Sequence, residues 1–371
     1  MSATSEWATV LVEARRVAAD ITGLLGVEVD AATILTGRAA VMNLARPGRI
    51  SAGGATRLLA TADGWCAIAL PRDDDVAALP ALMEVDAVTG DPWATLSRWV
   101  ATCSTDDVVD RARLLDIAAG GLGEAAAARP TVRRCGTSAG PRRADGLLVA
   151  DLSSLWAGPL CGQLLARAGT VVVKVESPSR PDGTRRGEPA FFDWMNAGKL
   201  SYCFDFDSER VALNRLLEAA DIVIEGSRPA ALRRRGLSAE DLAGRAGRIW
   251  LRISGYRDQP DRPAFGDDAA VAGGLVGGGA DGPVFCGDAI ADPLTGLEAA
   301  RAVGESLRRG GGEVVDVSMA QVAARYAALT QSPGAPAESP TLPPAVPPAS
   351  PLGADNAAVE LLVSERLCAP C

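Results

Sequence analysis

Histidine is absent from this 371-residue sequence, and its absence removes several classes of chemistry. A chain without histidine has no Ser-His-Asp triad, no Cys-His pair and no histidine ligands for zinc. Nucleophilic or acid–base chemistry must then use carboxylates, Lys, Tyr, Cys or Ser. Carboxylates in unusual surroundings are therefore the first candidates for a functional role.

Three further features are missing. The net charge of −9 argues against a broad basic surface for nucleic acid, and no apolar run approaches the length of a membrane span. The opening residues MSATSEWATVLVEARR have no basic region before an apolar stretch, so they predict no signal peptide. Eight scattered cysteines then indicate reduced thiols, and we expect a cytoplasmic protein that binds neither membrane nor nucleic acid.

A glycine-rich dinucleotide fingerprint is also lacking. The segment DLSSLWAGPLCGQLL, residues 151–165, has no GxGxxG spacing, which disfavours a nicotinamide or flavin cofactor. Trp156, Ala157, Gly158 and Pro159 nevertheless form a small-residue turn at the start of a predicted helix. Backbone N–H groups in such a turn can bind a phosphate or carboxylate, although a plain tight turn would have the same sequence.

Short apolar runs alternate with helical segments in the second half of the chain. The runs cover residues 147–152, 170–176, 201–206, 221–226, 248–254 and 311–319. This alternation predicts an α/β fold with a doubly wound, mostly parallel, Rossmann-like sheet. Upstream, two short strands within residues 54–70 and three helices within residues 76–117 predict a smaller α+β domain.

These patterns divide the chain into five parts. We expect a small α+β domain (1–125), a linker (126–146), a large α/β domain (147–330), a Pro-rich spacer (331–351) and a C-terminal helical tail (352–371).

Asp292 stands in GDAIADPLTGLEAA, residues 287–300, directly before Pro293. Aspartate is a favoured helix N-cap and proline is favoured at the first helical position, so the pair predicts a helix start. Because histidine is absent, the same carboxylate is also a candidate nucleophile or acid–base group. The local sequence allows either role.

Basic and glycine-rich segments offer further candidates. Arginines at 180, 185 and 186 follow a strand end, and residues 233–235 form a second cluster; both suit phosphate binding or a solvated loop. The glycine-dense segment 265–283 carries Asp267 and Asp268. It is either a surface loop or a source of backbone amides near a reacting centre.

Taken together, these motifs resemble family III CoA-transferases, the family of formyl-CoA:oxalate and carnitine CoA-transferases, with alpha-methylacyl-CoA racemases as relatives. The AGP turn, the VKVE strand end and the N-x-GK segment (Asn196, Gly198, Lys199) match in order and spacing. The resemblance covers residues 147–320 and the tail. Residues 56–83 resemble the family's small domain, which normally follows the large one, so the chain looks circularly permuted.

The resemblance implies a function and a site. Asp292 falls on the family's catalytic aspartate, which carries CoA between an acyl-CoA and a carboxylic acid through an aspartyl-CoA intermediate. We expect the helix dipole and nearby amides to keep Asp292 ionised. The implied CoA-binding residues are Trp156, Ala157, Gly158, Pro159, Arg185, Arg234 and Lys199. The implied secondary or oxyanion groups are Gly277, Gly278, Gly279 and Asp267.

CoA and acyl-CoA are then substrates, with no covalently bound cofactor and no metal. Family members form intertwined dimers, so we expect a homodimer.

The sequence departs from the family at four places. Ser177 replaces a basic residue common after VKVE, Gly226 and Ser227 replace a pair that lines the CoA site, and Phe265 stands where the racemases carry histidine. Two other functions therefore stay open. One is an acyl-CoA racemase or isomerase that uses Asp292 with Asp267 or Glu298, and the other is a non-catalytic protein that binds CoA esters.

Overall fold

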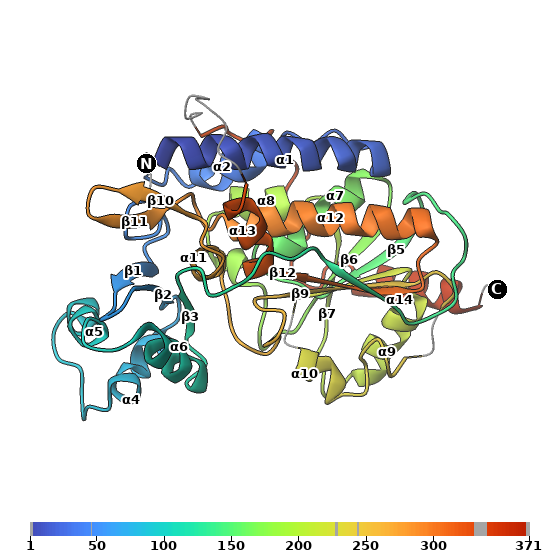
Figure 1. Ribbon diagram of the computed structural model, residues 1–371. Coiled ribbons are helices and arrows are strands. Elements are labelled where there is room, and N and C mark those ends of the chain that lie inside the picture. The colour runs from blue at the N-terminus through green and yellow to red at the C-terminus, as the bar shows by residue number, and fades with distance from the viewer. Residues whose placement is uncertain (1–2, 46, 227–228, 243–244, 330–339, 369–371) are drawn as a thin grey trace.

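The computed structural model describes residues 3–45, 47–226, 229–242, 245–329 and 340–368 (Figure 1). Ser227 and residues 331–339 of the expected spacer lie outside the described residues. Within these ranges, no helix is both long and apolar enough to cross a membrane.

A seven-stranded sheet forms the centre of the molecule, in the order β4-β12-β9-β8-β5-β6-β7. The strands are β4 (Thr131–Arg134), β5 (Leu148–Asp151), β6 (Val171–Glu176), β7 (Leu200–Cys203), β8 (Ile222–Glu225), β9 (Ile249–Ser254) and β12 (Glu313–Ser318). All neighbours except β4 run parallel. Counted along the chain, the six parallel strands lie in the order 3-2-1-4-5-6, which is typical of a doubly wound sheet. The predicted fold class is confirmed.

The expected linker contains an edge strand. Thr131–Arg134 pairs antiparallel with Glu313–Asp316, so the linker prediction is wrong for these residues. All four side chains of β4 are exposed. The strand therefore has no apolar pattern, and backbone pairing with β12 is what holds it in the sheet.

Helices cover both faces of the sheet (Figure 1). One face carries α7 (Ala157–Arg167), α8 (Pro189–Asn196) and α12 (Ala291–Arg309), with α1 (Ala3–Leu25) and α2 (Ala31–Val41) above them. The other face carries α9 (Arg210–Ala219), α10 (Pro229–Arg233) and α14 (Asn356–Cys368). Buried residues of α1 and α2, including Val17, Ile21 and Leu35, belong to the same apolar core as α7 and α12. The sequence placed α1 and α2 with the small domain; the structure places them in the large one.

The small unit begins later, with an antiparallel sheet of β1 (Thr56–Ala60), β2 (Trp65–Ala69) and β3 (Ala118–Gly121). Its helices are α3 (Asp73–Ala77), α4 (Leu79–Met83), α5 (Pro92–Val100) and α6 (Thr105–Leu114). Its own core includes Ile68, Leu82 and Leu96. Gly123 and Ala125 donate backbone hydrogen bonds to the carbonyls of Val271 and Ala272, so the unit is joined to α11 (Gly266–Ala272).

Four further elements belong to the described chain. The glycine-dense segment forms a hairpin of β10 (Val276–Gly279) and β11 (Gly282–Phe285), helix α13 (Met319–Ala327) follows β12, and a 3-10 turn, η1, covers Gly183–Arg186. The hairpin projects at the left of Figure 1, beside the start of α1. Residues 340–353 run as an irregular strap that donates from the Thr341 amide to Thr36 Oγ1 and from the Ala349 amide to Asp193.

Candidate active site

Asp292 is the second residue of α12, and it does not cap that helix. Ile290 precedes the helix with helical backbone angles (φ −57°, ψ −27°), and no side chain caps this end. The Asp292 carboxylate instead accepts the backbone N–H of Gly266, the first residue of α11. A helix does begin here, but of the two roles that the sequence allowed, the structure does not show the N-cap role for Asp292. The chain enters α12 through Ala289, whose φ of +42° turns the carboxylate toward α11.

Gly266 has no room for a side chain. A Cβ at this position would collide with the Asp292 carboxylate and with the Ala289 carbonyl oxygen. The backbone amide reaches the carboxylate because glycine allows this close approach. The two helix starts are therefore fixed against each other at the candidate nucleophile.

Two more carboxyl groups lie beside Asp292. Asp267, on α11, accepts the Ala289 amide at 3.0 Å, and Asp288 precedes α12. Both are buried, whereas Asp292 keeps part of its exposure to solvent. The candidate nucleophile is thus the least buried residue in a group of three acids.

Burial raises the pKa of Asp292 to about 7. The charge of Arg38 and the N–H of Gly266 act to lower it, and the charges of Asp267 and Asp288 act to raise it. The pKa of Asp267 is likewise raised by burial and by Asp288 to about 7. Contrary to the prediction from the sequence, the helix dipole and nearby amides therefore do not keep Asp292 fully ionised. Near pH 7 its protonated and charged forms are comparably populated.

Arg38, from α2, is the cation of this group. It forms an ion pair with Asp288. Its guanidinium lies 5.6 Å from the ring centroid of Trp156 and 5.7 Å from that of Phe191. Arginine favours such aromatic faces, so two rings and a carboxylate fix its position.

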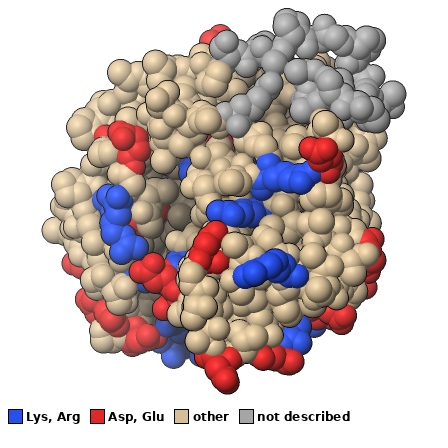
Figure 2. Space-filling view, turned by 90° about the vertical axis from the view of Figure 1, so that its left-hand side faces the viewer, with Lys and Arg blue, Asp and Glu red and all other residues tan. Residues whose placement is uncertain are grey.

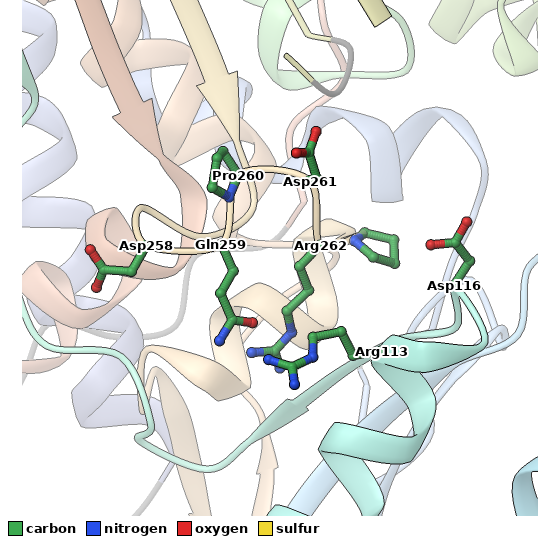
Figure 3. Close-up of a pocket in the computed structure, with 8 residues that line it drawn as sticks. Arg113, Asp116, Asp258, Gln259, Pro260, Asp261 and Arg262 are labelled. Carbon is green, nitrogen blue, oxygen red and sulfur yellow. The ribbon is translucent and has the colours of Figure 1, made fainter. Parts of the chain in front are cut away.

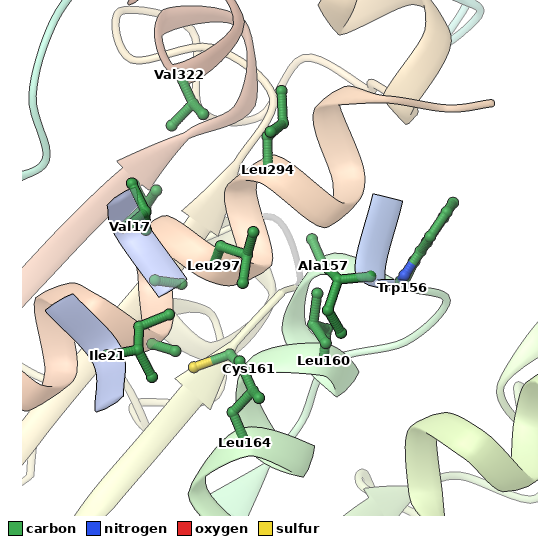
Figure 4. Packing of buried hydrophobic residues seen from close by; sticks show 14 of the residues in the cluster. Val17, Ile21, Trp156, Ala157, Leu160, Cys161, Leu164, Leu294, Leu297 and Val322 are labelled. Carbon is green, nitrogen blue, oxygen red and sulfur yellow. The ribbon is translucent and has the colours of Figure 1, made fainter. Parts of the chain in front are cut away.

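The Trp156–Pro159 turn lies directly beside α12. A Cβ at Gly296 would lie 2.8 Å from the Ala157 carbonyl oxygen, so the two helices touch one turn beyond Asp292. Figure 4 shows Leu294 and Leu297 of α12 among Ala157 and Leu160 of α7. The turn also follows β5 at the point where the strand order reverses, which is the usual ligand position of such sheets. The structure thus brings the predicted turn and Asp292 together.

Lys199 supports this turn from inside the protein. Its ammonium is buried and donates to Asp151 at 2.9 Å, to the Pro159 carbonyl at 2.9 Å and to Asn196 at 3.1 Å. Burial lowers the pKa of Lys199, while Lys199 and Lys174 outweigh burial and hold the pKa of Asp151 below its ordinary value. The N-x-GK motif therefore fixes the turn through a buried ion pair.

The two arginines that are predicted to bind CoA differ in exposure and in their partners. Arg185 donates to Glu176 (2.6 Å from Nη2) and to the Ser350 carbonyl (3.3 Å), and it lies 4.4 Å from the ring centroid of Phe192. Arg234 follows α10 and is exposed. Arg185 thus already has a carboxylate partner, whereas the side chain of Arg234 extends into solvent.

The predicted oxyanion glycines are strand residues. Gly277, Gly278 and Gly279 pair with Val284, Pro283 and Gly282 across the hairpin. The amide that the structure places on Asp292 belongs to Gly266 instead. An oxyanion role for the hairpin glycines stays a prediction.

The face that carries the hairpin and the small unit is hollowed, with acidic and basic side chains around the hollow (Figure 2). A separate recess of about 350 Å³ lies between α6 and the loop 258–263, where Arg113, Asp116 and Arg262 line it (Figure 3). Arg262 there donates to the Ala119 carbonyl and to Glu124, so its charge is already paired.

Across the described ranges, no three Cys, Asp or Glu side chains are grouped to hold a metal ion.

Sequence reasoning missed Arg38, Asp288 and Gly266. A signal existed for Arg38, because it is a lone charge in the otherwise uncharged segment AATILTGRAAV. Gly266 belongs to the glycine-dense segment 265–283, where the sequence does not distinguish it from the other glycines. No sequence pattern shows that residues 38 and 266 lie beside Asp292 in the folded protein.

Comparisons with known proteins show the family of this chain. Residues 144–344, more than half of the chain, match CoA-transferase family III. Similar curated proteins include the succinyl-CoA–D-citramalate CoA-transferase of Chloroflexus aurantiacus (32% identical, 48% of this chain and 50% of the relative) and the succinate–glutarate CoA-transferase of Agrobacterium fabrum (31%, 48% and 51%). The chain thus spans about half the length of the curated relatives it matches.

Two solved structures are also similar to part of the chain. A CAIB/BAIF family protein from Brucella suis is 30% identical, with a TM-score of 0.45 over 50% of this chain and 55% of that one. A hypothetical protein from Mycobacterium tuberculosis is 30% identical, with a TM-score of 0.44 over 51% and 56%. On the family match over residues 144–344, this chain belongs to CoA-transferase family III.

Proposed function

We propose that the protein is a CoA-transferase that moves CoA between an acyl-CoA and a carboxylic acid, with Asp292 as nucleophile. The observation that carries this proposal is the position of Asp292: a half-buried aspartate whose carboxylate is held by the Gly266 amide, beside the Trp156–Pro159 turn. Family membership and the names of the relatives support it.

The reaction uses the carboxylate twice. Asp292 attacks the thioester carbonyl, the C–S bond breaks and CoA thiolate leaves, which produces a mixed anhydride. The thiolate then attacks the Asp292 carbonyl carbon, so that the original acid departs and an aspartyl-CoA thioester remains. An acceptor carboxylate reverses both steps and leaves as its CoA ester, and Asp292 is regenerated.

In this proposal the Trp156–Pro159 turn receives CoA at the amides that begin α7. Lys199 fixes that turn, and the exposed Arg234 is better placed than Arg185 to meet a phosphate, because Arg185 is paired with Glu176. Gly277–Gly279 remain candidates for oxyanion contacts. An intertwined homodimer in the cytoplasm is part of the proposal, and light scattering tests the dimer.

The test is direct detection of the covalent intermediate. The protein is incubated with a panel of acyl-CoAs, and intact mass spectrometry measures a CoA adduct that hydroxylamine removes. Asp292→Asn should form none, because an amide cannot form the anhydride, while the exposed control Asp86→Asn should react normally. Adduct formation by folded Asp292→Asn would contradict the proposal, as would the absence of any adduct or transfer in the wild type.

The cluster of acids favours one second candidate, an isomerase that moves the proton alpha to the thioester. Asp267 and Asp292 both have pKa values of about 7, which suits proton transfer near neutral pH. Asp267 suits the role of partner acid better than Glu298, which is buried further along α12 in ion pairs with Arg301 and Arg325. Deuterium entering the acyl chain from D₂O without an acceptor acid would identify this activity.

A further inference from the structure

Arg38 reaches the site from a part of the chain that the family match does not include. The match begins at residue 144, and α2 lies upstream of it. Asp30 starts this helix by accepting the Ala32 amide at 3.0 Å. A Cβ at Gly37 would lie 2.7 Å from Trp194, so α2 is pressed against α8. These two contacts fix the helix that presents Arg38.

The side chain of Arg38 is held on three sides. Trp156 and Phe191 lie within cation–π distance, and Asp288 forms the ion pair. Trp156 is itself the residue before the α7 turn, and Asp288 is four residues before Asp292. Arg38 therefore contacts both segments that make the candidate site.

Without Arg38, the charged groups that act on Asp292 would all be acids. The charged groups that act on the Asp292 carboxyl are Arg38 from α2, Asp267 from α11 and Asp288 from the segment before α12. Two of them are acids, and Arg38 is the cation among them. A carboxyl surrounded by acids and little water favours its protonated form, which is a poor nucleophile.

We propose that Arg38 is a positioning residue for the Asp292 nucleophile, supplied by the N-terminal helices to hold Asp288 and to keep Asp292 in its carboxylate form. This inference rests on the proposed function, because it assigns a purpose to the charge of Asp292. It makes the N-terminal segment part of the reaction rather than an outer layer of the fold.

Two substitutions that change the local charge in opposite directions test this inference. Arg38→Gln removes the cation, and Asp288→Asn removes an acid while the amide keeps the shape. Both break the same ion pair, so a merely structural role would make them behave alike. If Arg38 acts through its charge, Arg38→Gln raises the pKa of Asp292 and Asp288→Asn lowers it.

The direct readout is ¹³C NMR of protein labelled at the aspartate carboxyl carbon, with the Asp292 signal identified by its loss in Asp292→Asn. We expect the Asp292 titration to move up by about one pH unit or more in Arg38→Gln, which lowers the carboxylate fraction about tenfold at pH 6. Arg38→Lys should restore most of it. The control Arg111→Gln removes an arginine stacked on Trp99 and paired with Glu84 in the small unit, and should change nothing.

The rate of CoA-adduct formation gives the second readout. Arg38→Gln should be slow at pH 6–7 and recover toward wild-type rates by pH 9. An unchanged Asp292 titration in folded Arg38→Gln, or shifts of the same sign in Arg38→Gln and Asp288→Asn, would overturn the inference. If the titrations shift oppositely but the wild type forms no adduct, the CoA-transferase function fails while the charge effect of Arg38 stands.

Discussion

Replacing Asp292 by Asn should stabilise the folded protein above pH 7 even though it removes the candidate nucleophile. Burial raises the pKa of this carboxyl from an ordinary value of 3.8 to about 7, so the fold disfavours its charged form. A change of this size corresponds to about 4 kcal/mol if it is expressed fully. Because Asp292 is only partly buried as a residue, we expect half of this free energy, about 2 kcal/mol.

The sign follows from the raised pKa. Below pH 4 the carboxyl is protonated in both the folded and the unfolded state, so wild type and variant should be equally stable. As the pH rises from about 4 to about 7, the unfolded state ionises first and the wild type loses stability relative to Asp292→Asn. Above pH 7 the difference should be constant.

Urea unfolding of both proteins at pH 4.5, 6 and 8 measures this difference, with Asp86→Asn as an exposed control that shows none. A variant that is less stable than the wild type at pH 8 would refute the reasoning. So would a gain in stability that is the same at all three pH values.

Other changes should give equally definite results. Gly266→Ala forces a methyl group into the carboxylate and should destabilise by about 1–3 kcal/mol in urea unfolding, whereas exposed Gly23→Ala in α1 should stabilise by about 0.5–1 kcal/mol. Lys199→Met leaves Asp151 buried without its partner and should cost about 3–5 kcal/mol, and a loss below 1 kcal/mol would contradict that reading. Arg234→Glu should weaken CoA binding in calorimetry without changing stability, and unchanged affinity would remove this arginine from the site.

The parallel sheet was predictable because its strands are buried on both faces. A run such as Val171–Glu176 is apolar enough to stand out, and its alternation with helices implies parallel pairing. Strand β4 was not predicted, because TVRR is exposed at the sheet edge and has no buried face. The helix on which α1 packs was not predictable either. Val17 and Ile21 predict that one face of α1 is buried, but the local sequence does not identify α12 as the helix that covers it.

The site was predictable only in part, for the same reason. Asp292 and the turn after β5 are short motifs whose residues are close in sequence. Arg38 acts on Asp288 and Asp292 only because two distant segments of the chain meet in the fold. The raised pKa of Asp292 is a property of that assembly, because it depends on burial and on the charges of Arg38 and Asp267, which lie on other helices.

The packing of α1 on α12 also sets the order in which the molecule can fold. A Cβ at Gly304 of α12 would lie 2.9 Å from Leu24 of α1, so residues far apart in the sequence are in contact. During synthesis, the apolar face of α1 is complete long before its partner leaves the ribosome. The helical layer, and with it the surroundings of Asp292, therefore closes late, through contacts of long sequence separation that slow folding.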